Sequence, residues 1–110
     1  MNVMELINSM MKRPQMFIYP VKIDYIFYFI FGFFMRDDLD FYDIDNAFKN
    51  CFSNWIVDWI DQNVGSRYES ENTLWYQSIM SAVKDDQEAV DLFFKASKEF
   101  FQDCINNHLT

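Results

Sequence analysis

The residues best suited to chemistry in this chain lie in one short acidic segment: Asp37, Asp38, Asp40, Tyr42, Asp43 and Asp45. Carboxylates this dense bind either a hard cation or a basic protein surface. A calcium loop of the EF-hand type needs a glycine at its sixth position and a glutamate at its twelfth. The segment has neither at the required offsets, so we predict no metal site.

Two interpretations of the acidic segment are open. In the first, its aspartates imitate nucleic-acid phosphate and bind a basic partner protein, with Tyr42 as an aromatic contact. In the second, the segment is a solvated turn, because aspartate also favours turns and helix caps. The partner-binding residues predicted under the first interpretation are Asp37, Asp38, Asp40, Tyr42, Asp43 and Asp45.

Catalytic groups are sparse. His108 is the sole histidine and has no nucleophile near it in the sequence. Asp85 and Asp86 are adjacent, so on a helix they point about 100 degrees apart, and helix capping explains them better than acid and base catalysis. The chain has no phosphate-binding glycine loop, nucleophile elbow or zinc-binding helix motif. We therefore predict neither an enzyme nor a cofactor.

The two cysteines, Cys51 and Cys104, are far apart in the sequence and lack the Cys-x-x-Cys spacing of zinc sites. Both fall on apolar stripes of predicted helices, where a free thiol behaves as a small buried hydrophobe. The segment from Met1 to Met11 carries Glu5 and lacks the basic opening of a signal peptide. Free thiols and a cytoplasmic location are expected.

The net charge of the chain favours some classes of binding partner over others. Nine Lys and Arg residues against 17 Asp and Glu give a net charge of -8. This charge repels nucleic acid and anionic lipid, and it accelerates encounter with a basic protein. The uncharged stretch from Tyr25 to Met35 is much shorter than the roughly 20 residues that span a bilayer. We expect a basic protein partner, no direct nucleic-acid contact and no membrane span.

The elements that position these residues are helices. Apolar residues recur at three and four positions, and 2 Gly and 2 Pro are too few for a sheet with many tight turns. The predicted fold is a single all-α domain over residues 1–110, a compact bundle of about five helices. The predicted helices are Val3–Met11, Ile23–Met35, Ala47–Asp61, Leu74–Val83 capped by Thr73, and Ala89–Ile105, with loops at Lys12–Pro20, Arg36–Asp45 and Asn63–Asn72 and a turn at Lys84–Asp86.

Aromatic residues, 20% of the chain, supply the predicted core. The helix Ile23–Met35 is apolar on all sides, which predicts neighbours on more than one face, and Gly32 would permit one of them to approach closely. The core assignments are Phe17, Phe27, Phe31, Phe34, Trp55, Trp59, Phe94 and Phe101. The exposed tyrosines proposed as interface contacts or core margins are Tyr19, Tyr42, Tyr68 and Tyr76.

The run Lys12-Arg13-Pro14-Gln15-Met16-Phe17-Ile18 follows a short amphipathic helix and precedes an aromatic-rich one. This opening resembles a family of small bacterial immunity proteins, in which Arg-Pro-Gly-Met-Tyr and a hydrophobic residue are typical. The similarity continues through Phe48–Ile60 and the Phe-rich closing helix, so it covers most of the chain. Gln15 departs from the family pattern, which has glycine there.

The resemblance implies a protein that neutralises a cognate toxin domain, commonly a nuclease delivered between neighbouring bacteria by contact-dependent inhibition or a related polymorphic-toxin system. Inhibition would be stoichiometric and non-covalent. The resemblance implies no particular binding residues, because the contacting surface differs among members. The alternative is a helical adaptor or regulatory subunit whose aromatic face completes a larger complex or a homodimer.

Overall fold

A computed structural model describes residues 1–35, 43–65 and 74–107 of the chain. These residues form five α-helices and one short 3-10 helix, with no strand among them, and they confirm the all-α prediction. The elements are α1 (Val3–Lys12), η1 (Pro14–Met16), α2 (Ile23–Phe34), α3 (Asp43–Asn63), α4 (Trp75–Ala82) and α5 (Asp86–Asn106).

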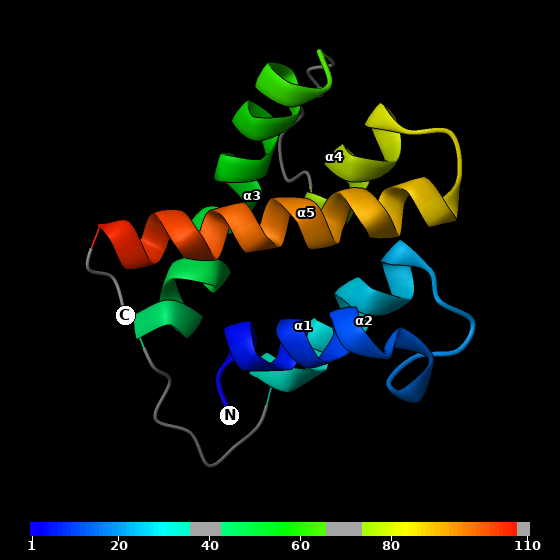
Figure 1. Ribbon diagram of the computed structural model, residues 1–110, viewed down its shortest axis with the longest axis horizontal. Helices are drawn as coiled ribbons and strands as arrows, with labels where there is room; N and C mark the ends of the chain where they lie inside the picture. Colours follow the sequence, from blue (N-terminus) through cyan, green and yellow to red (C-terminus); the bar gives the residue numbers. More distant parts are fainter. Residues whose placement is uncertain (36–42, 66–73, 108–110) are drawn as a thin grey trace.

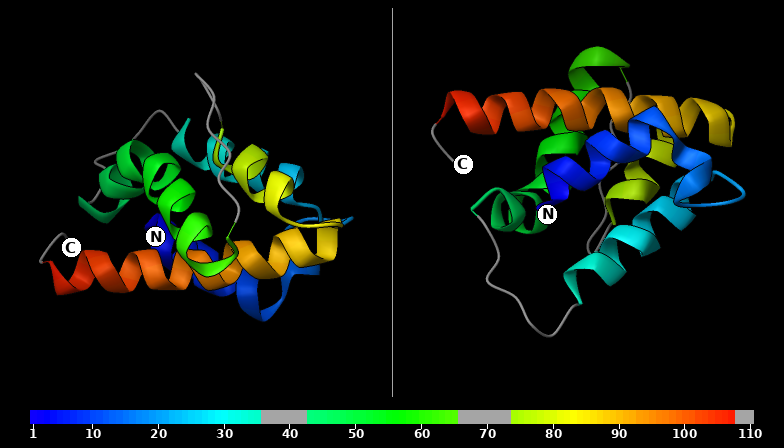
Figure 2. Two further views of the ribbon diagram at one scale, coloured as in Figure 1. Left: turned by 90° about the horizontal axis from the view of Figure 1, so that it is seen from above. Right: turned by 60° about the horizontal axis from the view of Figure 1, so that its bottom comes forward.

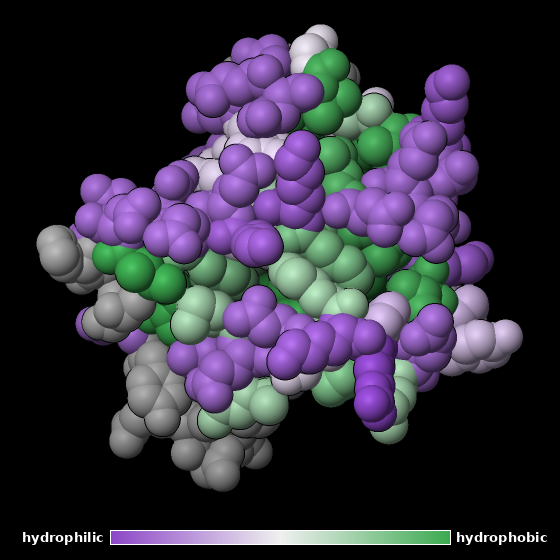
Figure 3. Space-filling view, in the orientation of Figure 1, coloured by the Kyte–Doolittle hydropathy of each residue, from purple (hydrophilic) through white to green (hydrophobic). Residues whose placement is uncertain are grey.

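The two long helices, α3 and α5, organise the bundle. Helix α5 runs across the front of the molecule in Figure 1, with α1 beside it and α3 crossing behind it, and the turned views in Figure 2 agree. Helix α3 packs against α1, α4 and α5, whereas α2 packs against α4 and α5. Hydrophilic side chains follow the outer surface of α5, with hydrophobic side chains visible beside them (Figure 3).

The first helix begins and ends through local signals. The Asn2 side chain accepts a hydrogen bond from the Glu5 backbone N–H at 2.8 Å, and the Glu5 carboxylate accepts one from the Asn2 N–H at 3.2 Å. This reciprocal pair satisfies two donors that a helix start leaves without partners. Pro14 then opens the 3-10 helix η1, because proline has no N–H with which to continue α1.

The centre of the core is a cluster of aromatic rings between α3 and α5. Phe52 is fully buried, and its ring centroid lies 4.5 Å from that of Phe48 and 5.2 Å from that of Phe100. Trp75, at the start of α4, stacks on Phe93 at 4.7 Å. These rings join the two long helices to α4, so aromatic packing supplies much of the buried apolar area.

Not every predicted core aromatic is buried. Phe27, Trp59 and Phe101 are buried as predicted. Phe17, Phe34, Trp55 and Phe94 are half-buried and pack against the margin of the core. The prediction for Phe31 is wrong, because 53% of this residue is exposed. A helical stripe gives the direction of a side chain but not how far the neighbouring helix extends over it.

The acidic segment is partly helical, which corrects the predicted loop Arg36–Asp45. Helix α3 already includes Asp43, which is exposed, and Asp45, which is buried with 2% of its surface exposed. The Asp45 carboxylate accepts a hydrogen bond of 2.6 Å from the backbone N–H of Val3, the first residue of α1. One carboxylate therefore lies at the amino ends of both α1 and α3, where helix dipoles favour negative charge.

Helix α5 begins at Asp86, three residues before the predicted start at Ala89, and its capping agrees with the sequence prediction. Asp85 is its N-cap, and the side chain accepts a 2.9 Å hydrogen bond from the Glu88 N–H. Helix α4 begins at Trp75 with Leu74 in the N-cap position, where the Leu74 N–H donates to the Gln77 side chain at 3.1 Å. Thr73, the predicted cap of this helix, lies outside the described residues.

Within the described ranges, none of the helices combines the length and the apolar character that crossing a membrane requires. Helix α2, the most apolar of them, has 12 residues.

Candidate protein-binding surfaces

The predicted partner-binding residues fall into two groups. Asp37, Asp38, Asp40 and Tyr42 lie outside the described residues. Asp43 is exposed on the first turn of α3. Asp45 is not available to a partner, because its carboxylate is buried and bonded to the amide of Val3. The prediction for Asp45 is therefore wrong, and the residue has a structural role that joins two helices.

Among the described residues, an exposed apolar feature lies on α2, which the sequence predicted only as a core helix with neighbours on more than one face. We call it the α2 face, and its exposed members are Tyr25, Tyr28, Phe29, Phe31, Gly32 and Met35. Tyr28 is 58% exposed and Met35 65%. Helix α2 buries only its opposite side against the bundle, because α4 and α5 pack on one side of it.

The residue types along α2 carried a signal for this arrangement. The buried residues Ile23, Ile26, Phe27 and Ile30 recur at the spacing of one helix side. The tyrosines and the glycine fall on the other side. A helix enclosed on every side would rarely combine two tyrosine hydroxyls with a glycine, because buried hydroxyls need partners and glycine weakens a helix.

Gly32 faces open space. A Cβ atom added to it would meet nothing within 4 Å, so the expected close approach of another helix of this chain is wrong for the described residues. Gly32 falls on the same side of α2 as Tyr25, Tyr28 and Phe29, since these positions are separated by three, four and seven residues. A helical glycine without a packing role in the chain lowers the stability of the helix. At this position it also leaves a space without a side chain among the aromatic residues.

An apolar groove of about 270 Å³ adjoins the α2 face. Helix α2 and its C-cap supply Phe27, Ile30, Phe31, Phe34 and Met35 to the lining, and the remainder is Phe48, Lys49, Ser53, Leu74 and Trp75. Lys49 and Ser53 are the polar members of this lining. The groove extends the exposed apolar surface from α2 towards α3 and the start of α4.

Tyr76 joins α4 to the margin of the α2 face. Its ring centroid lies 4.7 Å from that of Phe27 and 6.2 Å from that of Tyr28. A hydrogen bond with Tyr28, followed by burial and nearby negative charge, raises the pKa of Tyr76. Of the tyrosines proposed as contacts, Tyr76 is therefore half-buried at the core margin and Tyr19 is highly exposed, whereas Tyr42 and Tyr68 lie outside the described residues.

A second surface has the opposite character. We call it the acidic groove, a hollow of about 480 Å³ between α3 and α5, lined by Trp55, Asp58, Trp59, Gln62, Asn63, Glu99 and Asp103. The indole rings of Trp55 and Trp59 stack with centroids 6.1 Å apart and planes 19° apart. The indole N–H of Trp55 donates to the Asp103 carboxylate at 3.3 Å.

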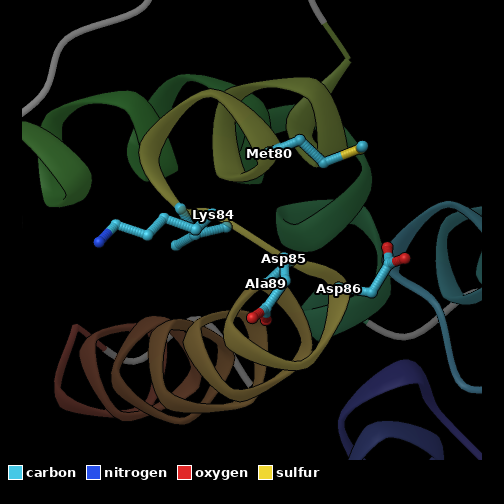
Figure 4. Close-up of a pocket in the computed structure, with 6 residues that line it drawn as sticks. Met80, Lys84, Asp85, Asp86 and Ala89 are labelled. Carbon is cyan, nitrogen blue, oxygen red and sulfur yellow. The ribbon is translucent and has the colours of Figure 1, made fainter.

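The pair Asp85 and Asp86 lies beside a smaller hollow of about 160 Å³ at the turn between α4 and α5. Figure 4 shows the two carboxylates pointing in different directions and the Lys84 side chain extending away from both. The groups do not converge on one point, and Asp85 is occupied in capping α5. The capping interpretation is confirmed for Asp85.

No family model, curated protein or solved structure matches this chain. The properties of the surfaces therefore rest on the chain's own geometry. Among the residues that the structure describes, no group of three or more His, Cys, Asp or Glu side chains is arranged to hold a metal ion.

Both cysteines are free thiols, as predicted, but they differ in exposure. Cys51 is exposed, which corrects its predicted burial, whereas Cys104 is buried on α5. Burial, with smaller contributions from Cys51 and Asp103, raises the pKa of the Cys104 thiol.

We expect a maleimide reagent to modify Cys51 in the folded protein at least about tenfold faster than Cys104, because the reaction needs an accessible thiolate. Mass spectrometry of digested samples taken over time measures both rates. In urea the two rates should converge. Equal rates without urea would contradict the burial of Cys104.

Proposed function

We propose that this protein is an immunity protein that binds a cognate toxin domain, a basic nuclease, and neutralises it by stoichiometric, non-covalent inhibition. The observation that carries the protein-binding part of the proposal is the α2 face. The toxin as partner follows from the resemblance of Lys12–Ile18 and the Phe-rich closing helix to small immunity proteins.

The α2 face has the composition of a protein interface. Aromatic residues and methionine are enriched at the centres of such interfaces, and tyrosine is common among the residues that contribute most to binding. Tyr28 and Phe31 of α2 and Met35, the C-cap of this helix, are each more than half exposed. Their order before binding supports affinity, because little side-chain and backbone freedom is lost on association.

Gly32 supports the same surface independently of the aromatic residues. A glycine within a helix lowers stability by about 0.5–1 kcal/mol relative to alanine. No described part of the chain uses the space above it. We infer that the partner fills this space. Its backbone would lie against Gly32 and its side chains between Tyr28 and Phe29.

The net charge of -8 supports a basic partner. Long-range attraction raises the association rate, while the apolar α2 face would slow dissociation through buried contacts. The two features therefore act on different steps of binding. A nuclease domain, which carries positive charge to bind phosphate, meets both requirements.

The alternative is a helical adaptor or a homodimer, and the α2 face favours this as well, since a second copy would also bury it. Light scattering at micromolar concentration separates the two. A monomer that forms a 1:1 complex with the toxin domain supports the immunity protein, and a stable dimer in which Phe31 is buried supports the alternative.

We expect Gly32→Gln to weaken binding to the proposed cognate toxin domain at least about tenfold, because the new side chain fills the gap on the α2 face. The variant should unfold at the same or higher urea concentration, since glutamine forms helices better than glycine by about 0.5–1 kcal/mol. Isothermal titration calorimetry and urea unfolding measure the two effects. Loss of binding therefore cannot result from loss of folding.

The matched control is Asn8→Gln, which changes an exposed residue of α1. Its affinity should stay within about twofold of the parent's, as expected for surface positions outside an interface. If Gly32→Gln binds as tightly as Asn8→Gln, the α2 face is not the binding surface. If the parent neither binds the toxin domain nor protects cells that express it, the immunity function is wrong.

A further inference from the structure

We propose that the acidic groove between α3 and α5 binds an arginine side chain presented by a basic protein segment. The groove joins stacked indoles, Trp55 and Trp59, to the carboxylates of Asp58, Glu99 and Asp103. It is separate from the α2 face, to which none of its lining residues belongs. The proposal goes beyond the toxin-binding function, because it concerns another surface and its test needs no toxin.

The carboxylates define the charge of the ligand. Asp58 extends from α3, and Glu99 and Asp103 lie one turn apart on α5. Among the residues that the structure describes, the charged side chains of the lining are Asp58, Glu99 and Asp103, and all three are acidic. A groove of one charge sign with apolar walls concentrates ions of the opposite sign.

One oxygen of the Asp103 carboxylate already has a hydrogen-bond partner in the groove. Its Oδ2 accepts the hydrogen bond from the Trp55 indole N–H at 3.3 Å, which holds the carboxylate against the aromatic wall. The remaining oxygen is the acceptor for a guanidinium, together with the carboxylate of Glu99 one turn earlier. A carboxylate that already has one hydrogen-bond partner loses less freedom on binding a cation than one without a partner.

The indoles favour arginine over lysine. A guanidinium is planar, stacks on aromatic rings and donates several hydrogen bonds within one plane, whereas an ammonium is compact and strongly hydrated. Trp is the side chain with the strongest cation–π attraction. Of the two stacked indoles, Trp55 is half-buried and has the exposed ring surface for such a contact, because Trp59 is only 6% exposed.

Two further features favour a protein segment over free arginine. The volume of about 480 Å³ is of the size of sites for ligands larger than one side chain. Trp59, 6% exposed, lines the groove, and its indole N–H has no acceptor among the described residues. A buried donor without a partner costs about 1–3 kcal/mol, and a peptide carbonyl reaching it would recover part of that cost.

The probe is a tetra-arginine peptide with blocked ends, followed by NMR of the Trp55 and Trp59 indole N–H signals. We expect both signals to shift in a saturable manner. The variant Glu99→Gln/Asp103→Asn should bind at least about tenfold more weakly, since it removes two charged acceptors. Tetra-lysine should bind the parent at least about threefold more weakly than tetra-arginine does.

The matched control is Asp86→Asn/Asp91→Asn, which makes the same change of charge on the same helix outside the groove. Its affinity should remain within about threefold of the parent's, since charges far from the ligand are screened by salt. If both double variants lost the same affinity for tetra-arginine, net charge alone would explain the loss, and the proposed site would be wrong. Unmoved indole signals, or equal affinity for tetra-lysine, would overturn it as well.

Discussion

Replacing Phe52 by alanine is expected to lower the free energy of unfolding by about 3–5 kcal/mol, a large share of the stability of a small domain. Phe52 is fully buried and its ring contacts Phe48, Phe93 and Phe100 within about 6 Å between centroids. Removing the ring leaves a cavity where α3 meets α5, and both helices are held by other contacts that prevent collapse. Urea unfolding followed by circular dichroism measures the loss.

The matched comparison is Phe94→Ala, which removes the same ring from a half-buried position on α5. It should cost less than half as much as Phe52→Ala, because part of the ring is already in water and the site can relax. Equal losses at the two positions would contradict the distinction between the centre and the margin of the core.

The second large effect is expected at Asp45. Replacing it by alanine should lower the free energy of unfolding by about 2–3 kcal/mol, because the buried Val3 N–H loses its acceptor and α1 loses a charge at its amino end. Asp45→Asn should cost less, since the amide oxygen can still accept the hydrogen bond. Urea unfolding of both variants measures the difference.

Asp43→Ala is the control for Asp45, because Asp43 lies in the same first turn of α3 but is exposed. Its effect should stay below about 1 kcal/mol, the range of a charge near a helix end. If Asp43→Ala and Asp45→Ala were equally destabilising, the hydrogen bond to Val3 would not be the cause. If Asp45→Ala were neutral, Asp45 would be available for the surface role that its sequence neighbours suggest.

The periodicity of the sequence was enough to place the helices. Apolar spacing located α1, α2 and α5 to within a few residues, since one side of each must be apolar to join a core. The capping of α5 could also be predicted from the sequence, because the Asp85 side chain accepts its hydrogen bond from the backbone N–H of Glu88, only three residues away. These features depend on residues close in the chain, so no long-range information was needed.

The candidate surfaces needed the tertiary structure. Along α2 the sequence gives an apolar residue in nearly every direction, and only the positions of α4 and α5 decide that Phe27 is buried while Phe31 is exposed. The acidic groove joins Trp55 on α3 to Asp103 on α5, which are 48 positions apart. Periodicity reports which residues share a side of one helix, and it carries no information about which helices meet.

Asp45 shows that the sequence alone also does not determine which charged residues are exposed. Its sequence neighbours Asp37, Asp38 and Asp40 made it part of an acidic segment, yet its carboxylate reaches Val3, 42 positions earlier, and is buried there. The sequence by itself determined the helical class, the core-forming stripes and the excess of negative charge. The tertiary structure decided which aromatic rings and carboxylates remain exposed, because exposure depends on the helix that packs opposite each residue.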